Sequence, residues 1–395
     1  MTGGIRLGRL FGIQILIQPS WFLILGLLTL SLATGVFPAL IAASPVVYWS
    51  LALVAALLLF GSVLVHELAH SLVARAQGIP VRSITLFLLG GVSSIEAEPA
   101  GPGREVLVAG VGPLASLLIG GVLIAVGSLV QAPPALRALA LYLGYLNVVL
   151  AAFNMLPAFP LDGGRVLRAV LWARWHDRAR ATAGAAEVGR MSGYALLAVG
   201  VLLVLAGDLI GGLWTCFVGW MLLQSSRAAC RLSVAESRLE GVTVARLMDR
   251  PAAWVPPLVT LDAAAHDYLQ ARHARCLPVA GASDGEFTGA VCLADLQKVP
   301  PNQWDHDRVA DVMSRRGDAV EMEPGRPATE ALRALVSSRA HLVAVVHDGR
   351  LLGLVDEAAL TGFVARAELA ARLGHGRAPS AGHGGHHGTP TGRAA

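Results

Sequence analysis

The chain has little charge for its length. Charged residues make up 15% of its 395 residues, and hydrophobic residues make up 54%. Soluble domains normally contain about 25% charged residues, so the composition argues against a wholly soluble protein and places part of the chain in lipid. The deficit is local, because residues 10–232 are poor in charge whereas residues 235–370 have an ordinary soluble composition. We therefore expect the main domain boundary near residue 235.

Lysine and cysteine are also scarce. Lys298 is the only lysine, so the net charge of +4 comes from arginines, and the arginines of the apolar half lie mainly in short loops between apolar segments. That placement is typical of membrane topology, and no nucleic-acid partner is expected. The cysteines lack CxxC spacing, so we interpret them as packing residues of a reducing compartment rather than as disulfides or metal ligands. They are Cys216, Cys230, Cys276 and Cys292.

Six apolar segments are long enough to cross a bilayer, which takes about 20 helical residues. They cover residues 16–38, 46–75, 105–130, 136–157, 189–207 and 209–228. Arginines gather in alternate loops, and the positive-inside rule then predicts a multi-pass protein of the cell (inner or plasma) membrane with both termini in the cytoplasm. Re-entry or burial of one or two segments is the alternative.

An H-E-x-x-H motif ends a long uncharged run. No charged residue lies between Arg9 and Glu67. His66 and His70 are four positions apart and share one helix face, so both imidazoles can bind one metal ion. Glu67 lies beside them, where it can take a proton from an attacking water. Chance is the alternative, but ionisable groups inside a span are costly and usually functional, so the motif predicts a catalytic zinc site.

One zinc ligand is missing from this motif, since catalytic zinc usually has three protein ligands and one open position. The stretch FNMLPAFPLDGGRVLRA, residues 153–169, contains Asp162 at the end of the fourth span. That is the depth expected of His66 and His70. Asp162 could instead cap the helix that follows it; together with the two histidines it is the expected third ligand.

Together, HELAH and NMLPAFPLDGGR resemble the motifs of the site-2 proteases, a family of intramembrane zinc metalloproteases. The chain closely resembles the bacterial and archaeal members with C-terminal CBS domains, and the resemblance covers about residues 5–230. The resemblance implies that His66, His70 and Asp162 bind one Zn²⁺ per chain. It also implies that Glu67 activates water, and that the substrates are transmembrane proteins cut by regulated intramembrane proteolysis.

The resemblance extends to residues beside these motifs. Asn154 matches a family asparagine that steadies the substrate or the oxyanion, a role suited to an amide donor; taken alone, it is a helix-packing residue. Gly90 and Gly91 match a G-G stretch in a membrane-associated sheet, whose exposed strand edge pairs with an extended substrate. A plain cytoplasmic loop is the alternative there. The third span opens with AGVGPLAS, similar to the family's A-G-P stretch, and has Ser116 near a position where the family often has asparagine.

An internal repeat of about 65 residues fills the soluble part of the chain. VARLMDRPAAW, from residue 244, parallels VADVMSRRGDA, from residue 309. Each repeat is expected to contain a helix, a strand, a second helix and a β-hairpin, with turns at residues 284–285 and 348–349. This pattern resembles a tandem pair of CBS domains.

The CBS resemblance implies a nucleotide site, because such pairs commonly bind adenine nucleotides in the cleft between repeats. Asp295 fits a position that often holds a ribose, whereas Ala359 replaces it in the second repeat. A structural or partner-docking role is the alternative, and a homodimer through the CBS domains is a further expectation.

The tail, residues 373–395, is of low complexity and expected to be disordered.

The expected fold combines a polytopic all-α membrane bundle, with six spans and a small membrane-associated β-hairpin, and α/β tandem CBS domains. The predicted domains cover residues 1–232, 243–300 and 306–368. The leading hypothesis is an intramembrane zinc endopeptidase that hydrolyses peptide bonds in or near transmembrane segments, modulated by a cytoplasmic CBS pair. The alternative is a CBS-regulated transporter or channel, which predicts charges along a path through the spans, and these are few. A catalytically dead scaffold would not need the complete set of metal and base residues.

Overall fold

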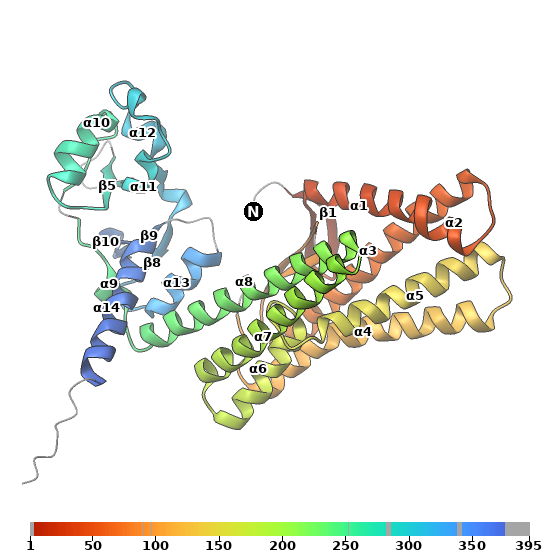
Figure 1. Cartoon of the computed structure of the whole chain (residues 1–395). Coiled ribbons are helices and arrows are strands. Elements are labelled where there is room, and N and C mark those ends of the chain that lie inside the picture. Colours follow the sequence, from red (N-terminus) through yellow and green to blue (C-terminus); the bar gives the residue numbers. More distant parts are fainter. Residues whose placement is uncertain are drawn as a thin grey trace, which may run out of the picture. The chain divides into compact units, whose positions relative to one another are not determined.

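The computed structural model divides into two compact units, Met1–Val234 and Ala235–Ala395 (Figure 1). It describes residues 4–88, 90–95, 97–251, 253–281, 286–337 and 342–375. The turn predicted at residues 284–285 lies outside these residues, as does the tail from residue 376. The last helix extends to His375, so the first residues of the predicted tail are helical.

Six helices in the described part of the chain are long and apolar enough to cross a membrane, which confirms the predicted number of spans. They are Pro19–Leu40 (α1, a π-helical turn and α2), α3 Pro45–Ala76, α4 Pro102–Leu129, α5 Pro134–Asn154, α7 Arg178–Leu205 and α8 Leu209–Leu239. The first four begin with proline, whose missing N–H costs nothing in the first helical turn.

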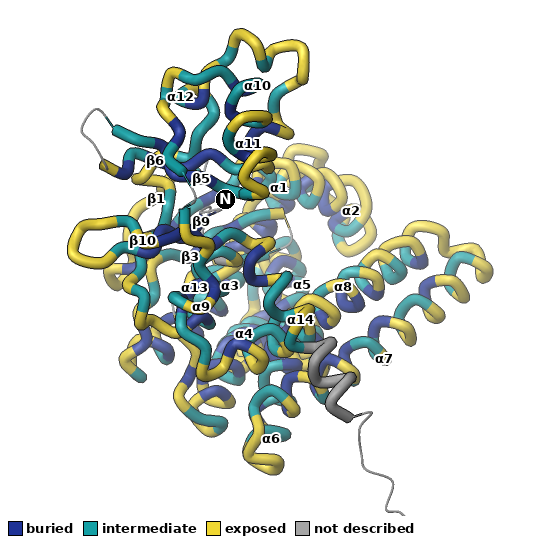
Figure 2. Tube along the Cα trace, turned by 90° about the vertical axis from the view of Figure 1, so that its left-hand side faces the viewer, coloured by how far each residue is buried: buried dark blue, intermediate teal, exposed yellow. Residues whose placement is uncertain are grey.

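The apolar side chains of these helices point outward as well as inward. Figure 2 shows exposed positions along α7 and α8, and these include Leu205, Ile210 and Trp214. Large exposed apolar surfaces are unusual on soluble proteins and are expected where lipid is the solvent. Both helices extend beyond the predicted spans, because the apolar run marks only the lipid-embedded part of a helix that continues into polar sequence.

A four-stranded sheet belongs to the membrane unit, with the order β1-β2-β3-β4. The strands are β1 Ile5–Leu10, β2 Ile13–Ile17, β3 Val81–Phe87 and β4 Gly90–Ile95. β3 and β4 form the predicted hairpin, and β4 is an edge strand. The N-terminal hairpin was not predicted, because its short alternating pattern merges with the apolar run of the first span. Its buried residues are Ile13, Ile15 and Ile17.

Helices α4 and α5 run side by side at short range (Figure 1). Gly120 and Gly144 allow this approach: a Cβ atom on Gly120 would lie 2.9 Å from the Gly144 carbonyl oxygen. Small residues permit such close packing between helices in lipid. A loop after α5 leads to α6, Asp162–Trp175, which precedes α7.

The second unit contains two three-stranded sheets with helices, one for each predicted repeat, but the short third strand of the first sheet, Ser314–Arg315, belongs to the second repeat. The first sheet has the order β5-β6-β7, with Cys276–Ala280, Phe287–Cys292 and Ser314–Arg315; the second has the order β10-β9-β8, with Arg350–Asp356, Leu342–His347 and Val320–Met322. The helices include α9 Val244–Leu247, α10 Leu261–Ala263, α11 Leu293–Leu296, α12 Val309–Val312, α13 Ala328–Ser337 and α14 Glu357–His375. Asp348 and Gly349 both have positive φ, as expected for the predicted hairpin turn.

The interpretation of all four cysteines as packing residues is wrong for one pair. Cys276 and Cys292 form a disulfide, whereas Cys216 and Cys230 are free. The bonded pair faces each other across β5 and β6 with a Cα–Cα distance of 4.0 Å. Spacing alone did not reveal the pair, because strand register decides which residues lie opposite each other.

Candidate metal centre

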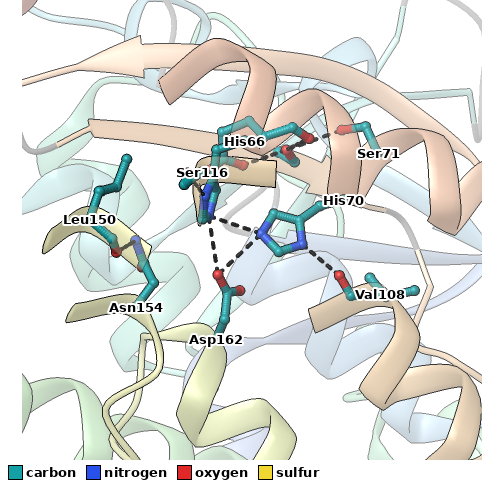
Figure 3. A network of polar contacts seen from close by, with 10 residues as sticks. His66, His70, Ser71, Val108, Ser116, Leu150, Asn154 and Asp162 are labelled. Atoms are coloured by element: carbon teal, nitrogen blue, oxygen red, sulfur yellow. Dashed lines mark hydrogen bonds and ion pairs between the residues drawn. The ribbon is translucent and has the colours of Figure 1, made fainter. Parts of the chain in front are cut away.

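Three polar side chains from two helices converge in the membrane unit. His66 and His70 come from α3, and Asp162 is the first residue of α6. Asp162 Oδ2 lies 3.2 Å from His66 Nε2 and 3.1 Å from His70 Nε2 (Figure 3). The two Nε2 atoms are 3.2 Å apart, and all three side chains are buried. Folding therefore brings the three predicted zinc ligands to one point.

The outer nitrogens of both imidazoles are held by α4. His70 Nδ1 lies 2.5 Å from the Val108 carbonyl oxygen, which can only accept a hydrogen bond, so Nδ1 donates and Nε2 keeps its lone pair. His66 Nδ1 lies 2.9 Å from Ser116 Oγ, which allows the same tautomer. Such contacts commonly fix the ring orientation of metal-binding histidines. Ser116 thus makes a polar contact with one of the predicted ligands.

The spacing of the three inner atoms fits a shared cation. Ligand atoms bonded to tetrahedral zinc at about 2.0–2.1 Å lie about 3.3 Å from one another, close to the 3.1–3.2 Å found here. Two imidazole lone pairs and a carboxylate have no proton to share in this tautomer. Two nitrogens and one oxygen are also a donor set that zinc accepts, so these residues fit the predicted metal.

Space for a metal ion is provided by a glycine of α4. A Cβ atom on Gly112 would lie 2.7 Å from His66 Nε2, and it would also collide with His70 Nε2. Any side chain at this position would therefore enter the volume between the ligand atoms. Gly112 was not singled out from the sequence, although it lies in the AGVGPLAS stretch that was.

Glu67, the predicted base, follows His66 on α3 and contacts strand β4. Glu67 accepts a hydrogen bond of 2.6 Å at Oε2 from Ser93 Oγ of β4. A Cβ atom on Gly91 would lie only 2.6 Å from Glu67 Cγ, so β4 packs directly on the glutamate side chain. Gly91 therefore lies at the site, whereas Gly90 begins the strand and has open space around it.

Comparisons with known proteins agree with this geometry. The model of peptidase family M50 matches residues 54–140 and 127–200, which include both motifs. A Synechocystis sp. relative named as a zinc metalloprotease, sll0528, is 36% identical over 364 residues, covering 91% of this chain and 95% of the relative. The chain belongs to peptidase family M50. Rip3 of Mycobacterium tuberculosis, also named as a zinc metalloprotease, is 34% identical over 370 residues, covering 90% of this chain and 94% of the relative.

A solved structure gives a further match. The site-2 protease from Methanocaldococcus jannaschii is 29% identical and covers 58% of this chain and 95% of that chain, with a TM-score of 0.41. The family and the named relatives confirm the prediction of an intramembrane zinc metalloprotease and disfavour the transporter.

Charge is concentrated around Asp162 of this M50 peptidase. Burial acts to raise the pKa of the Asp162 carboxyl, but hydrogen bonds from His66 and His70, which require a proton on Nε2 in place of a metal ion, outweigh it and lower that pKa to about 2. Burial lowers the pKa of Arg165, an effect that the carboxylates of Asp162 and Glu105 oppose. Asp162 is therefore an anion at neutral pH, with an arginine one helical turn away.

The backbone around Asp162 is tightly folded. A Cβ atom on Gly163 would lie 2.5 Å from the Leu156 carbonyl oxygen, and one on Gly164 would lie 2.6 Å from the Ala158 carbonyl carbon. The DGG sequence is thus needed for the loop after α5 to lie against the start of α6. This contact holds Asp162 at the height of the two histidines.

Asn154 ends α5 beside the three converging side chains (Figure 3). Its Nδ2 donates to the Leu150 carbonyl oxygen at 3.0 Å, which leaves the second N–H of that amide for another acceptor.

A second, buried asparagine of α5 was not predicted from the sequence: Asn147 Nδ2 lies 3.2 Å from Ser62 Oγ on α3. A polar residue within an apolar span was the available signal.

A buried ion pair between α4 and α6 was also not predicted from the sequence. Glu105 of α4 is 1% exposed and accepts hydrogen bonds from Nε (2.8 Å) and Nη2 of Arg168 on α6. Arg168 Nη1 also lies 3.5 Å from Glu98. Arg168 is one of the arginines that gather in alternate loops, a pattern that does not show which of them pairs with a buried glutamate.

Asp295 is placed differently from the other predicted site residues. Its buried carboxylate accepts from the Cys292 backbone N–H at 3.1 Å and from Lys298 Nζ at 2.8 Å, so it caps α11. A pocket of about 380 Å³ is lined by residues of both repeats and includes Ala359 but not Asp295. Its other lining residues are Arg246, Leu247, Met248, Asp249, His273, Arg275, Phe363 and Arg366.

Proposed function

We propose that His66, His70 and Asp162 hold one Zn²⁺ and that this M50 peptidase uses it to hydrolyse peptide bonds in transmembrane segments. The observation that supports this most directly is the triangle of ligand atoms 3.1–3.2 Å apart. When bound, zinc would supply Lewis-acid polarisation of the scissile carbonyl and of the attacking water.

Glu67 is the proposed general base. Its carboxylate accepts the proton of the water that attacks the carbonyl carbon, and returns it to the departing amine nitrogen as the C–N bond breaks. Packing of Gly91 against Glu67 Cγ restricts the rotamers of this side chain. Restricted motion favours catalysis because proton transfer needs a fixed donor–acceptor geometry.

Asn154 is the proposed oxyanion donor. The amide N–H that is not bonded to Leu150 could donate to the carbonyl oxygen as that oxygen gains negative charge. The short tether to Leu150 at 3.0 Å limits rotation of the amide.

The substrate is proposed to bind as an extended strand along β4, with Gly90 and Gly91 leaving space for it. A helical peptide bond is shielded and already hydrogen-bonded, so cleavage requires local unwinding. The free edge of β4 offers backbone partners to an unwound segment. Because β4 also contacts Glu67, a strand bound there would lie next to the base.

Arginine distribution supports a plasma or inner membrane protein with both termini in the cytoplasm. Cleavage is then proposed in the cytoplasmic third of the substrate's span, at the level of the metal ligands. A homodimer through the CBS domains stays a prediction.

The CBS pair is proposed to bind an adenine nucleotide in the pocket that contains Ala359. Four basic side chains line this pocket, and its volume of about 380 Å³ suits a small anionic ligand. The four are Arg246, His273, Arg275 and Arg366. Asp295 would contribute nothing there, since its carboxylate caps α11. Arg366→Gln should weaken ATP or AMP binding measured by calorimetry, whereas Arg350→Gln, at the start of β10 and outside the pocket, should not. Equal nucleotide affinity in both variants would show that the nucleotide does not bind in this pocket.

The decisive experiment for the protease is Glu67→Gln, assayed for zinc content and for cleavage of a transmembrane substrate in membranes. Loss of a general base typically lowers the rate by about 10²- to 10⁴-fold, while the metal ligands are untouched and zinc should stay at one per chain. Glu187→Gln, on the exposed surface of α7, is the matched control. Full activity of the Glu67 variant would refute the mechanism, and a wild-type protein without zinc would refute the centre.

A further inference from the structure

Ser93 connects the edge strand to the proposed base. Ser93 Oγ lies 2.6 Å from Glu67 Oε2 and 3.2 Å from Ser71 Oγ. An ionised carboxylate can only accept, so Ser93 donates to Glu67 and receives its own hydrogen bond from Ser71. The Glu67 backbone carbonyl oxygen is a second acceptor at 3.4 Å, but the carboxylate oxygen is much closer, so the hydroxyl points mainly towards the carboxylate.

We propose that Ser93 is a positioning residue for catalysis, which holds Glu67 by one carboxylate oxygen and leaves Oε1 as the proton acceptor. This inference rests on the proposed role of Glu67. A hydrogen bond of 2.6 Å to an ionised group is of the strong, charge-assisted type. The role of Ser93 does not require contact with substrate or metal.

Two features of β4 suit it to this role. Gly91 removes the side chain that would push Glu67 away, since a Cβ atom there would lie 2.6 Å from Glu67 Cγ. Ser93, two positions along, lies on the same face of the strand and supplies the hydroxyl. The neighbouring Ser94 has the opposite orientation, and its Oγ is bonded to Ser83 Oγ of β3 at 3.3 Å.

A consequence for kinetics follows from this geometry. Substrate pairing with β4 would use the backbone of its free edge, whereas Ser93 acts through its side chain on the face that contacts α3. Loss of the hydroxyl should therefore slow the chemical step without weakening substrate binding. Residues that orient a catalytic metal site typically contribute about 10- to 100-fold, and we expect kcat to fall by that factor.

The test uses the full-length zinc-loaded protein in nanodiscs and a transmembrane peptide substrate. Ser93→Ala should lower kcat by about 10- to 100-fold with KM and zinc content unchanged. Ser93→Thr restores a hydroxyl on a β-branched side chain and should recover most of the rate. Ser83→Ala, which removes a hydroxyl from the neighbouring strand β3 without a contact to Glu67, is the control and should behave as wild type. Wild-type kcat for Ser93→Ala, or a rise in KM that accounts for the whole loss, would overturn the proposal.

A double-mutant cycle separates this inference from the proposed function. If Ser93 acts through Glu67, adding Ser93→Ala to Glu67→Gln should cost nothing further in kcat. Additive losses would show that Ser93 acts independently of Glu67 and would overturn the positioning role. Full activity of Glu67→Gln alone would instead refute the base itself, whatever the serine variants do.

Discussion

Gly112 of α4 lies against His70 of α3 so closely that a Cβ atom on the glycine would come within 2.5 Å of His70 Cε1. The same atom would lie 2.7 Å from His66 Nε2. The backbone of helix α4 at Gly112 therefore lies directly against the proposed ligand atoms. Because glycine has no side chain, the two imidazoles can approach each other at this point.

Gly112→Ala should abolish zinc binding and proteolysis, because the added methyl group occupies the space between the two imidazoles. The measurement is zinc per chain by atomic emission on the purified protein. Gly110→Ala, on the same helix with open space around its Cβ position, controls for a general effect on α4. Stoichiometric zinc in Gly112→Ala would show that the ligands converge elsewhere.

Asp162→Asn should also release zinc, for an electrostatic reason. The substitution keeps the shape of the side chain but removes the anion that faces both histidines at 3.1–3.2 Å. The loss of affinity should exceed the roughly 10- to 100-fold typical of residues that merely orient a ligand, as measured by competition with a zinc chelator.

The control for this substitution is Asp177→Asn. Asp177 caps α7 by accepting from the Arg180 backbone N–H, and asparagine caps helices about as well as aspartate. Its zinc affinity should match the wild type. An Asp162→Asn protein that binds zinc as tightly as this control would remove the aspartate from the ligand set.

The spans and the three proposed ligand residues were predictable because their signals are local. A helix needs a continuous apolar run to cross lipid, and His66 and His70 interrupt such a run with costly polar groups. Asp162 was found for the same reason, at the end of another uncharged segment. Each of these signals can be read along the chain without knowing what packs against it.

The parts that could not be predicted depend on contacts between distant segments. Gly112 and Ser93 are small residues whose importance comes only from the side chains opposite them, on α3. The β1–β2 hairpin is short and its pattern merges with the next span. The Cys276–Cys292 pair is defined by strand register, which the spacing of cysteines does not contain.

The ion pair between Glu105 and Arg168 gives the last prediction, on stability. Glu105 is 1% exposed, and its carboxylate receives two hydrogen bonds from the Arg168 guanidinium. Removing one member of a buried ion pair costs about 3–5 kcal/mol, because the remaining charge stays buried without compensation. Arg168 retains a contact of 3.5 Å with Glu98, so Glu105→Gln should lower the unfolding free energy by about 3 kcal/mol, the lower end of that range.

Because α4 provides Gly112 and α6 provides Asp162, loosening this pair should release zinc at a lower temperature than in the wild type. The measurement is the Tm of the detergent-solubilised protein, followed together with zinc release into a fluorescent chelator. Glu187→Gln removes an exposed pair with Arg190 and should change stability by less than about 1 kcal/mol. An equal, small Tm shift in both variants would mean that the buried pair does not stabilise the packing of α6 against α4. A large Tm shift in Glu105→Gln alone, with zinc lost in the same transition, would show that this contact positions Asp162.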